Sequence, residues 1–591
     1  MAPDDKLPSA EQLSELIAEA GRAGNNALLQ GDGDTAATIF TELLGLQPSN
    51  PIALCGLGDI AAAMGDTTKA ENFYRKAADE APTSALGHRR LAETYLRQHR
   101  TQRALRNLAK AQAAAPDDAD LIYMQALAEN LSGHKDKTMA LLKRTLEMAP
   151  NHLQANNDIG CIMAERGDHD AAIPHLEIAT ANPNATPEMG INLGNALMLA
   201  SRYDEACAVI ERALERQPDD AGMLTALATA ERRAGRLDDA RLHVEKALAM
   251  TDEDTRVQNL AGTIYRELGL FDESEQYFMR ALELAPDDAN ATSNLGMLRL
   301  LKGEWVQGLK DYERRLDVGE FKRPWGILPL PTWDGSDING KSIIVCSEQG
   351  FGDTLQFARF IAPLAARGAN VKFAVQPELL RLIEGMDAPF DIVRPNDTLD
   401  NIDYQITVMS LPLTLGIASP DEISGAAYLQ APKPSGDIAA ALAELTGLKV
   451  GINWQGSTLH KENFKRSMTP DDLAPLLAVE GCTFVRLDVG AEGDLPGVTD
   501  LRPLINDFAD AAAIVDALDL VITVDTATLH LAGALGKPCW GLIAYVADWR
   551  YMLGRDDTPW YDSVDLIRQP TPGDWPSVIS DAAQRLTTMA R

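Results

Sequence analysis

Two patterns of apolar and polar positions divide the chain near residue 340. Up to about residue 322, small and apolar residues return at a fixed interval, which is typical of a repeated helical unit. From Lys341 onward, short apolar runs alternate with segments long enough for a helix, and this alternation predicts parallel strands joined by helical crossovers. The sequence therefore predicts an α-helical repeat region followed by an α/β region.

The prolines of the first region give its period. Every interval between them is 34 residues or a multiple of 34: Pro48, Pro82, Pro116, Pro150, Pro218 and Pro286. With proline at position 32, nine units span residues 17–322, and positions 8 and 20 of each unit hold small residues. Small residues let the two helices of a hairpin approach closely, and proline ends the second helix. The pattern resembles the tetratricopeptide repeat, which residues 259–286 match closely.

Stacked repeats of this kind form a solenoid with a long concave face, which favours binding of a protein or peptide partner. A spacer or a self-association surface is the alternative. Asparagines on the first helices of several units are candidates to hold the backbone of an extended acceptor peptide; solvated polar positions are the alternative for each. They are Asn156, Asn157, Asn192, Asn195, Asn259, Asn290 and Asn294.

Five segments follow from these patterns. Residues 1–16 are a tail, 17–322 the solenoid, 323–340 a proline-rich linker, and 341–434 and 435–591 two Rossmann-like halves. Two such halves are expected to bind ligands in the cleft outside the carboxyl ends of their strands.

The apolar run Leu520–Val524 ends at a polar turn that precedes a helical segment. Asp525, Thr526 and Thr528 lie in this turn, and His530 lies about one turn into the helix. The first turn of a helix presents free N–H groups and the positive end of its dipole, so this place suits a phosphate. Many α/β proteins have a polar turn here, so the turn alone is a weak signal.

A Gly-x-Gly turn follows the first predicted strand of the α/β region. Gly350 and Gly352 indicate a tight turn or a close approach of a ligand. Asp353 lies at the start of the next predicted helix, where it is either a catalytic group or an N-cap.

A polar loop follows the strand KVGIN. The strand end holds Trp454, Gln455, Gly456 and Ser457. Lys465 and Arg466, next to Ser467, are cations in an acidic chain and are candidates to neutralise a phosphate leaving group; a solvated loop is the alternative. His460 and His530 both lie near predicted strand ends, which favours a site over a buried structural role.

Composition narrows the function classes. The formal net charge of -32 argues against nucleic acid and anionic membranes as partners, because both require a basic surface. The N-terminus lacks a signal sequence, and no apolar run of 18 residues follows, so we expect a soluble cytoplasmic protein without membrane insertion. The six cysteines are far apart and form no C-x-x-C pair, so we expect neither a metal site nor a disulfide framework.

Several motifs of the second region resemble the catalytic domain of bacterial proteins that fuse tetratricopeptide repeats to a glycosyltransferase. They are EQGFGDTLQFARF, TWDGSDINGK, INWQGS, RSMTP, VDTATLHLAGALGKPCW and DWRYMLGRDDTPWY. That domain is similar to the heptosyltransferase-like (family 9) and O-GlcNAc-transferase-like enzymes. In layout, length and acidity the chain most resembles the alphaproteobacterial flagellin glycosyltransferase, whose repeats bind flagellin and whose catalytic domain transfers a nonulosonic acid such as pseudaminic acid.

The resemblance implies a GT-B fold, in which residues 341–434 form the acceptor-side half and residues 435–591 the donor-binding half. It also implies an inverting, metal-independent reaction with a nucleotide-sugar donor, CMP-linked for a nonulosonic acid. It implies Asp353 as general base on an acceptor hydroxyl, with His530 stabilising the phosphate leaving group. The residues expected at the donor site are Gly350, Gly352, Trp454, Gln455, Gly456, Lys465, Arg466, Ser467, Asp525, Thr526 and Thr528. Gln356 and Phe357 stand where heptosyltransferases have a histidine, which puts lipopolysaccharide acceptors in doubt.

The sequence is compatible with three functions. The chain is either a protein O-glycosyltransferase, a non-catalytic repeat adaptor with a decayed transferase domain, or a transferase acting on a glycan or lipid-linked acceptor. The presence of the Gly-Asp, Arg-Ser and Asp-Thr motifs together argues against decay.

Overall fold

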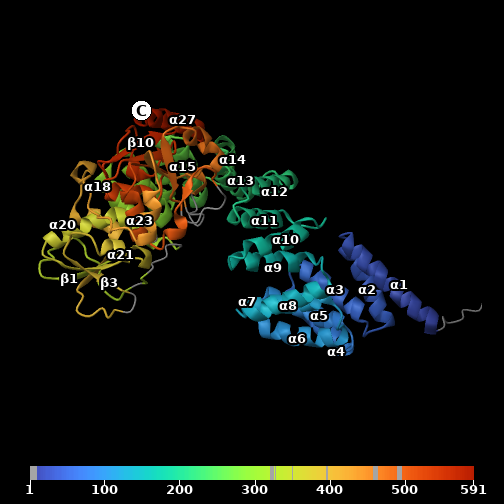
Figure 1. The fold of residues 1–591 in the computed structure, drawn as a ribbon. Helices are drawn as coiled ribbons and strands as arrows, with labels where there is room; N and C mark the ends of the chain where they lie inside the picture. The colour runs from blue at the N-terminus through green and yellow to red at the C-terminus, as the bar shows by residue number, and fades with distance from the viewer. Residues whose placement is uncertain are drawn as a thin grey trace, which may run out of the picture. The chain divides into compact units, whose positions relative to one another are not determined.

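The computed structural model describes residues 10–319, 325–326, 328–348, 350–394, 397–456, 463–488 and 495–591. The chain separates into two compact units, Met1–Pro218 and Asp219–Arg591 (Figure 1). The last three predicted repeats thus cluster with the α/β region, whereas the sequence pattern places the boundary after residue 322.

The described part of the first unit consists of six helical hairpins. Its helices are α1 Ala10–Leu29, α2 Gly33–Leu46, α3 Pro51–Ala63, α4 Thr67–Glu80, α5 Ala85–Arg97, α6 Thr101–Ala114, α7 Ala119–Leu131, α8 Lys135–Met148, α9 Leu153–Glu165, α10 His169–Thr180, α11 Pro187–Leu199 and α12 Tyr203–Arg216. Polar N-caps start the first helices of several hairpins; the side chain of Asn50, for example, accepts from the N–H groups of Ile52 and Ala53 at 3.0 Å. Such a cap stabilises a helix by about 1 kcal/mol.

A left-handed residue joins the two helices of each complete hairpin in this unit. Glycine occupies this position in four hairpins, as at Gly65 with φ 84°, because it adopts positive φ without steric cost. His99 and Ser201 occupy it in the other two, with φ 55° and 61°. The turn therefore keeps the same left-handed geometry in the two hairpins that lack this glycine.

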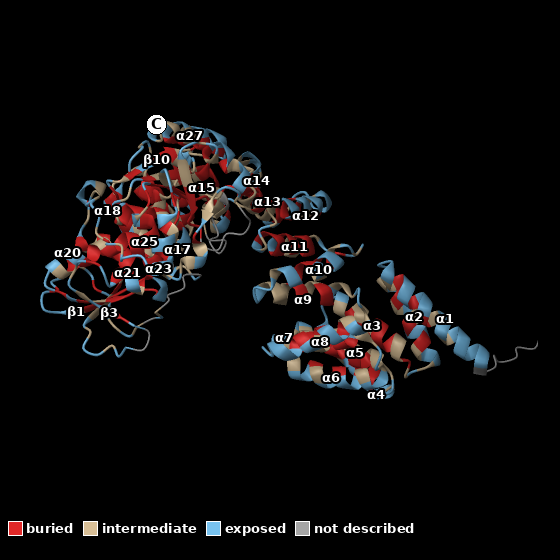
Figure 2. Ribbon diagram, in the orientation of Figure 1, coloured by how far each residue is buried: buried red, intermediate tan, exposed pale blue. Residues whose placement is uncertain are grey.

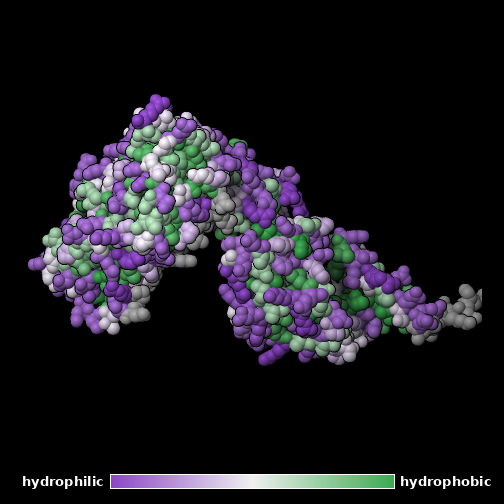
Figure 3. Space-filling view, in the orientation of Figure 1, coloured by the Kyte–Doolittle hydropathy of each residue, from purple (hydrophilic) through white to green (hydrophobic). Residues whose placement is uncertain are grey.

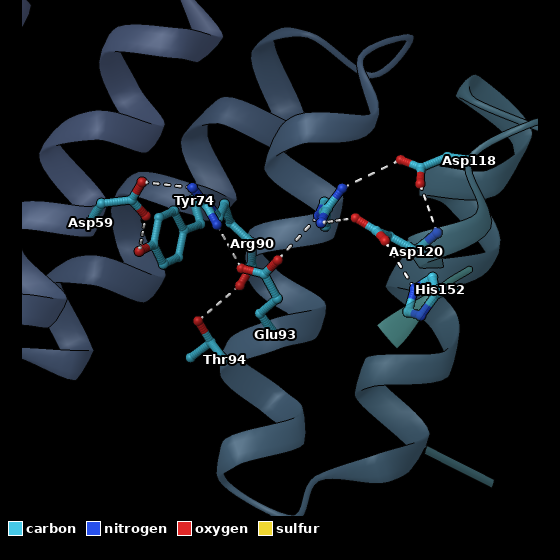
Figure 4. A network of polar contacts seen from close by, with 9 residues as sticks. Asp59, Tyr74, Arg90, Glu93, Thr94, Asp118, Asp120 and His152 are labelled. Carbon is cyan, nitrogen blue, oxygen red and sulfur yellow. Dashed lines mark hydrogen bonds and ion pairs between the residues drawn. The ribbon is translucent and has the colours of Figure 1, made fainter. Parts of the chain in front are cut away.

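Polar contacts link neighbouring hairpins of the first unit (Figure 4). Arg90 of α5 donates to Asp59 of α3 at 3.0 Å and to Glu93 at 2.8 Å. Tyr74 of α4 donates its hydroxyl to Asp59 at 2.7 Å. On the other side, Nε2 of His152 lies 3.1 Å from Asp120 of α7. The Arg90–Asp59 and His152–Asp120 contacts connect successive hairpins, whereas the Tyr74–Asp59 bond joins the two helices of one hairpin.

The second unit begins with three further hairpins. Their helices are α13 Ala221–Arg233, α14 Leu237–Met250, α15 Thr255–Glu267, α16 Phe271–Leu284, α17 Ala289–Lys302 and α18 Trp305–Tyr312, followed by the 3-10 turn η1 Glu313–Asp317. A Cβ on Gly262 of α15 would lie 2.5 Å from Cε1 of Phe278 of α16. The prediction that small residues permit close helix approach is therefore confirmed. The N-terminal 300 or so residues form a helical repeat solenoid.

A four-stranded parallel sheet follows, in the order β3-β2-β1-β4. Its strands are β1 Ser342–Cys346, β2 Asn370–Ala374, β3 Phe390–Val393 and β4 Tyr404–Thr407. Its helices are α19 Phe351–Phe357, α20 Ile361–Ala366, α21 Leu380–Ile383 and α22 Leu411–Leu415. Cys346 lies opposite Thr407, so β1 and β4 end side by side.

The second sheet has six parallel strands in the order β10-β9-β8-β5-β6-β7. Its strands are β5 Leu448–Asn453, β6 Cys482–Arg486, β7 Thr499–Asp500, β8 Leu520–Val524, β9 Cys539–Ile543 and β10 Val564–Arg568. Its helices are α23 Gly436–Ala443, α24 Ala474–Leu477, α25 Phe508–Asp516, α26 Ala527–Ala534 and α27 Trp575–Met589, with the 3-10 turns η6 Asn463–Lys465 and η9 Trp549–Tyr551. The predicted α/β region is confirmed, and the strand order is that of a dinucleotide-binding sheet.

Most residues of β1, β2, β5, β6, β8, β9 and β10 are buried, as are the helix faces packed on the sheets (Figure 2), whereas β3, β4 and β7 are mostly half-buried or exposed. Apolar and polar residues are interspersed on the face of each unit seen in Figure 3. Among the helices that the structure describes, none combines the length and apolar character needed to cross a bilayer.

Candidate functional site

The topology of the second sheet defines the place of the candidate site. Chain crossovers leave the central pair β5 and β8 in opposite directions, toward β6 and toward β9. The carboxyl ends of such a pair are where open α/β sheets bind ligands. Asn453, the last residue of β5, lies opposite Thr523 of β8, and Asp525 and Thr526 follow β8 directly. The polar turn predicted from sequence therefore lies at this position.

Asn453 joins the two strand ends. Its amide donates to the hydroxyl of Thr528 at 2.9 Å and to that of Thr526 at 3.3 Å. Its oxygen accepts from the N–H of Gln455 at 3.2 Å. Sequence reasoning missed Asn453, although an amide that ends an apolar strand, in GINW, is a usable signal.

Thr526 is the N-cap of α26, and its hydroxyl accepts from the N–H of Thr528 at 3.3 Å. Arg466 reaches the same turn and donates to the carbonyl of Asp525 at 2.8 Å. The guanidinium and the positive end of α26 thus lie together, which favours an anion.

Gly456 is required by this arrangement. A Cβ at this position would lie 2.7 Å from Nε of Arg466 and would also collide with Asn463. The N–H of Gly456 donates to the hydroxyl of Ser467 at 3.3 Å. The structure therefore brings Gly456, Arg466 and Ser467 together.

Two predicted donor residues are engaged elsewhere. Trp454 is 2% exposed and packs in the core under Arg486, whose guanidinium lies 4.7 Å from the ring centroid. Lys465 donates to Glu267 of the repeat helix α15 at 2.6 Å, and Arg232 of α13 binds the same carboxylate. These side chains therefore pack the sheet and join it to the repeats. Ser457 and His460 lie outside the described residues.

The first sheet contributes Gly350, Gly352 and Asp353. Gly350 precedes α19 and has an ordinary φ of -86°. Its lack of a side chain leaves room for Asp353, because a Cβ there would lie 2.5 Å from Oδ2 of Asp353. Asp353 lies inside α19 and is not its N-cap. A Cβ on Gly352 would lie 2.9 Å from Cδ2 of His530. Close approach, and not a left-handed turn, explains both glycines.

Arg550 of η9 connects the two halves. It donates to Oδ1 of Asp353 at 2.7 Å, to Asp548 at 2.7 Å and to the side-chain oxygen of Gln356 at 2.7 Å. Arg550 is 7% exposed, whereas the side chain of Asp353 is 29% exposed. Gln356 thus holds the arginine. The motif DWRYMLGRDDTPWY contained Arg550, but its role was not predicted.

Burial and charge set the protonation states of the site. Burial raises the pKa of Asp353, and Arg550 opposes this shift. Burial also raises the pKa of Asp525, against Arg466; its carboxylate accepts from the hydroxyl of Tyr551 at 2.7 Å. Arg550 lowers the pKa of Asp548, even though burial alone would raise it. The carboxylates of Asp353 and Asp525 thus accept a proton at a higher pH than an exposed aspartate does.

His530 is a neutral group at this site. Its ring is 5% exposed, and burial, together with Arg550, lowers its pKa to about 3. Nδ1 of His530 lies 3.1 Å from the hydroxyl of Tyr561, and Nε2 has no hydrogen-bond partner among the described residues. A neutral imidazole can still donate or accept one hydrogen bond through Nε2.

The repeat asparagines fall into three groups. Asn156 is fully buried and bonds the carbonyls of Pro150 and His152 at 2.8 and 3.2 Å, so it stabilises the start of α9 and the prediction of an acceptor contact is wrong for it. Asn192 donates to Asn157 at 2.9 Å, and Asn294 donates to Asn259 at 2.9 Å. The exposed positions are Asn195 and Asn290.

Comparison with known proteins supports the repeat region. The tetratricopeptide repeat model matches residues 22–85 and 191–255, and a second tetratricopeptide repeat model matches residues 255–288. The N-terminal half carries tetratricopeptide repeats. Protein FlbA of Caulobacter vibrioides is 28% identical over 326 residues, which are 49% of this chain and 54% of FlbA. The chain therefore spans about half the length of this curated relative.

Among solved structures, the chain is similar to PilF of Pseudomonas aeruginosa, with a TM-score of 0.33 and 14% identity over 35% of this chain and 95% of PilF. It is also similar to MamA of Desulfovibrio magneticus RS-1, with a TM-score of 0.25 and 21% identity over 28% of this chain and 92% of MamA.

Proposed function

We propose that this protein is a cytoplasmic protein O-glycosyltransferase with an inverting, metal-independent GT-B catalytic region. It transfers a sugar from a nucleotide donor to a serine or threonine of a protein held by the repeats. The motif resemblance makes flagellin the proposed acceptor, and a CMP-linked nonulosonic acid such as pseudaminic acid the proposed donor.

One observation carries the proposal. The first sheet supplies Asp353 and the second supplies His530 and the start of α26, and Gly352 and His530 are in contact. A group that accepts a proton and a place suited to a phosphate thus belong to adjoining helices from two different sheets.

The reaction follows from these groups. The acceptor hydroxyl gives its proton to Oδ2 of Asp353, while Arg550 holds Oδ1. The hydroxyl oxygen forms a bond to the anomeric carbon as the bond from that carbon to the phosphate oxygen breaks. Arg466 and the first turn of α26 stabilise the charge that develops on the departing phosphate.

The repeats supply the acceptor surface. The pairs Asn157–Asn192 and Asn259–Asn294 each keep amide groups beyond the bond that joins them. Such groups pair with the backbone of an extended peptide without regard to its side chains. The repeats thereby hold the acceptor protein through its backbone, and the catalytic site determines which serine or threonine hydroxyl reacts.

The test is a calorimetric titration of the full chain with CMP, UDP, GDP and ADP, followed by a transfer assay on purified flagellin read by intact mass. We expect one nucleotide to bind, with at least tenfold weaker affinity in Arg466→Gln. Arg585→Gln is the matched control, because Arg585 pairs with Asp581 on the exposed face of α27. A folded chain that binds none of the four nucleotides contradicts the proposal.

A non-catalytic adaptor is the second candidate. The ion pair of Arg550 with Asp353 favours it, because such a pair also occurs as a purely structural bridge between two domains. Flagellin that binds the repeats but gains no mass with any nucleotide sugar would favour the adaptor.

A further inference from the structure

The strand order of the first sheet reverses between β1 and the edge strand β4, and a residue that follows the last repeat helix fills the space at the ends of these two strands. In the order β3-β2-β1-β4, the carboxyl ends of β1 and β4 are the usual ligand position. Arg315 of η1, directly after the last repeat helix, lies there with Glu348 and Ser410.

The contacts of Arg315 form a buried network. The guanidinium donates to both carboxylate oxygens of Glu348, at 2.6 and 3.1 Å. It also donates to Glu313 at 2.7 Å and to the hydroxyl of Ser410 at 3.1 Å. Arg315 is 6% exposed and Glu348 3% exposed. A bidentate pair that is this deeply buried has a single geometry.

One chain of contacts leads from this pair to Asp353 through the first sheet. Glu348 accepts through its backbone carbonyl from the amide of Gln376 at 3.0 Å. The oxygen of Gln376 accepts from the hydroxyl of Thr354 at 2.9 Å. Thr354 is the neighbour of Asp353 in α19, so the position of Glu348 constrains the position of Asp353.

A second chain of contacts leads there through aromatic rings. The guanidinium of Arg315 lies 4.8 Å from the ring centroid of Tyr312, and that ring lies 5.6 Å from the ring of Trp549. Trp549 precedes Arg550, which donates to Asp353. Two separate chains of contacts therefore connect Arg315 with Asp353.

We propose that Arg315 is a positioning residue through which the last repeat holds Asp353 in the geometry that sugar transfer requires. The proposal rests on the proposed function and adds a role for the repeats beyond acceptor binding. Transfer then depends on the docked state of the last repeat, while nucleotide binding at the second sheet does not.

The charged groups around Asp353 predict opposite shifts of the pH–rate profile when Arg315 or the charge of Glu348 is removed. The groups that act on its carboxylate are Arg550, Asp548, Glu348 and Arg315. Burial is the main cause of its raised pKa; within the ion pair, Glu348 raises the pKa of Asp353 further and Arg315 lowers it. Removing Arg315 therefore shifts the acidic limb of the transfer rate to higher pH, and removing the charge of Glu348 shifts it to lower pH.

The experiment uses the full chain carrying Arg315→Met, Glu348→Gln or both. Arg314→Met is the matched control, because the side chain of the neighbouring Arg314 is 40% exposed, pairs with Asp317 at 3.4 Å and donates to the carbonyl of Asp287, without contacting Glu348. We expect Arg315→Met to lower kcat about 10- to 100-fold, as misplacement of a catalytic group does, with nucleotide affinity within twofold of the parent. We expect opposite shifts of the acidic limb in the two single variants and partial recovery of kcat in the double variant.

Shifts in the same direction, or a kcat for Arg315→Met equal to that of Arg314→Met, would overturn the inference while the parent chain still transfers sugar. If Arg315→Met does not fold, Glu348→Gln decides, because it keeps the shape of the side chain; an unmoved acidic limb overturns the inference. A parent chain that transfers no sugar overturns the proposed function as well.

Discussion

Gly352 of α19 and His530 of α26 are in direct contact, although their helices belong to different sheets. A Cβ atom on Gly352 would lie 2.9 Å from Cδ2 and 3.6 Å from Nε2 of the imidazole. The contact holds the helix that carries Asp353 against α26, whose N-cap is Thr526. A side chain at residue 352 therefore requires the imidazole or one of the two helices to shift.

The first prediction concerns this contact. Gly352→Ala should cost about 1–3 kcal/mol of stability, because an added carbon overpacks a close contact. It should also lower sugar transfer about 100-fold, because a displacement near 1 Å misplaces the reacting groups. Gly436→Ala is the control, since a Cβ there meets nothing within 4 Å. Thermal unfolding and kcat check both effects, and full transfer by Gly352→Ala would contradict this account of the site.

Asp353→Asn tests the proton acceptor. It should lower kcat about 10²- to 10⁴-fold, as loss of a positioned base does. Because burial raises the pKa of Asp353, the parent rate should rise with pH through a value above the ordinary 3.8 of an aspartate. The rate rises in that direction because the base must be ionised. A pH profile of kcat at saturating donor measures this limb, which should disappear in Asp353→Asn; an unchanged limb would assign the base to another residue, with Asp525 as the next candidate.

His530 should remain neutral throughout the physiological range. Its pKa of about 3 lies below the ordinary 6.5, so the unfolded chain binds this proton first and stability falls as pH drops below 6.5. The loss should reach about 2 kcal/mol by pH 5. In carbon–proton NMR spectra of the full chain with labelled histidine, the signal that disappears in His530→Gln should not move between pH 5 and 8. A midpoint near 6.5 for that signal would disprove the buried, neutral imidazole.

How far the sequence predicts this molecule depends on the range of the interactions. The 34-residue period reports contacts within one hairpin, such as Gly262 against Phe278, and so it predicted the solenoid. The strand ends with Gly456, Arg466 and Thr526 were also predictable, because polar residues interrupt apolar runs there. The contacts of Lys465 with Glu267 and of Trp454 with Arg486 were not predictable, because the two residues of each pair are distant in sequence and no local pattern marks the pairing. Arg550 escaped prediction for the same reason.

Ser201 tests the energetics of the repeat turn. It has φ 61° where most hairpins of the first unit have glycine, and a left-handed conformation costs a non-glycine residue roughly 1 kcal/mol. Ser201→Gly should therefore raise stability by about 0.5–1 kcal/mol, since the flexibility of glycine in the unfolded chain offsets part of the gain. Gly65→Ala is the reciprocal control, with φ 84° and open space, and should destabilise. Denaturant unfolding followed by circular dichroism measures both, and a loss of stability in Ser201→Gly would refute the explanation.

The last prediction concerns where the catalytic region can be cut. Trp305 of the last repeat is 2% exposed, and its ring centroid lies 6.0 Å from Trp549 and 5.9 Å from Trp560 of the second half. Cutting after residue 322 would expose these rings, each of which buries about 150–250 Å². It would also delete Arg315 and leave Glu348 without its ion-pair partner.

We therefore expect a chain of residues 323–591 to bind the dye ANS and to lack cooperative unfolding. A chain of residues 219–591 keeps the packed repeats and should unfold cooperatively. Calorimetry of the two fragments compares them directly. Cooperative unfolding of residues 323–591 at the temperature of the longer fragment would show that the repeats are a separate domain, and the dependence of Asp353 on the last repeat would fail with it.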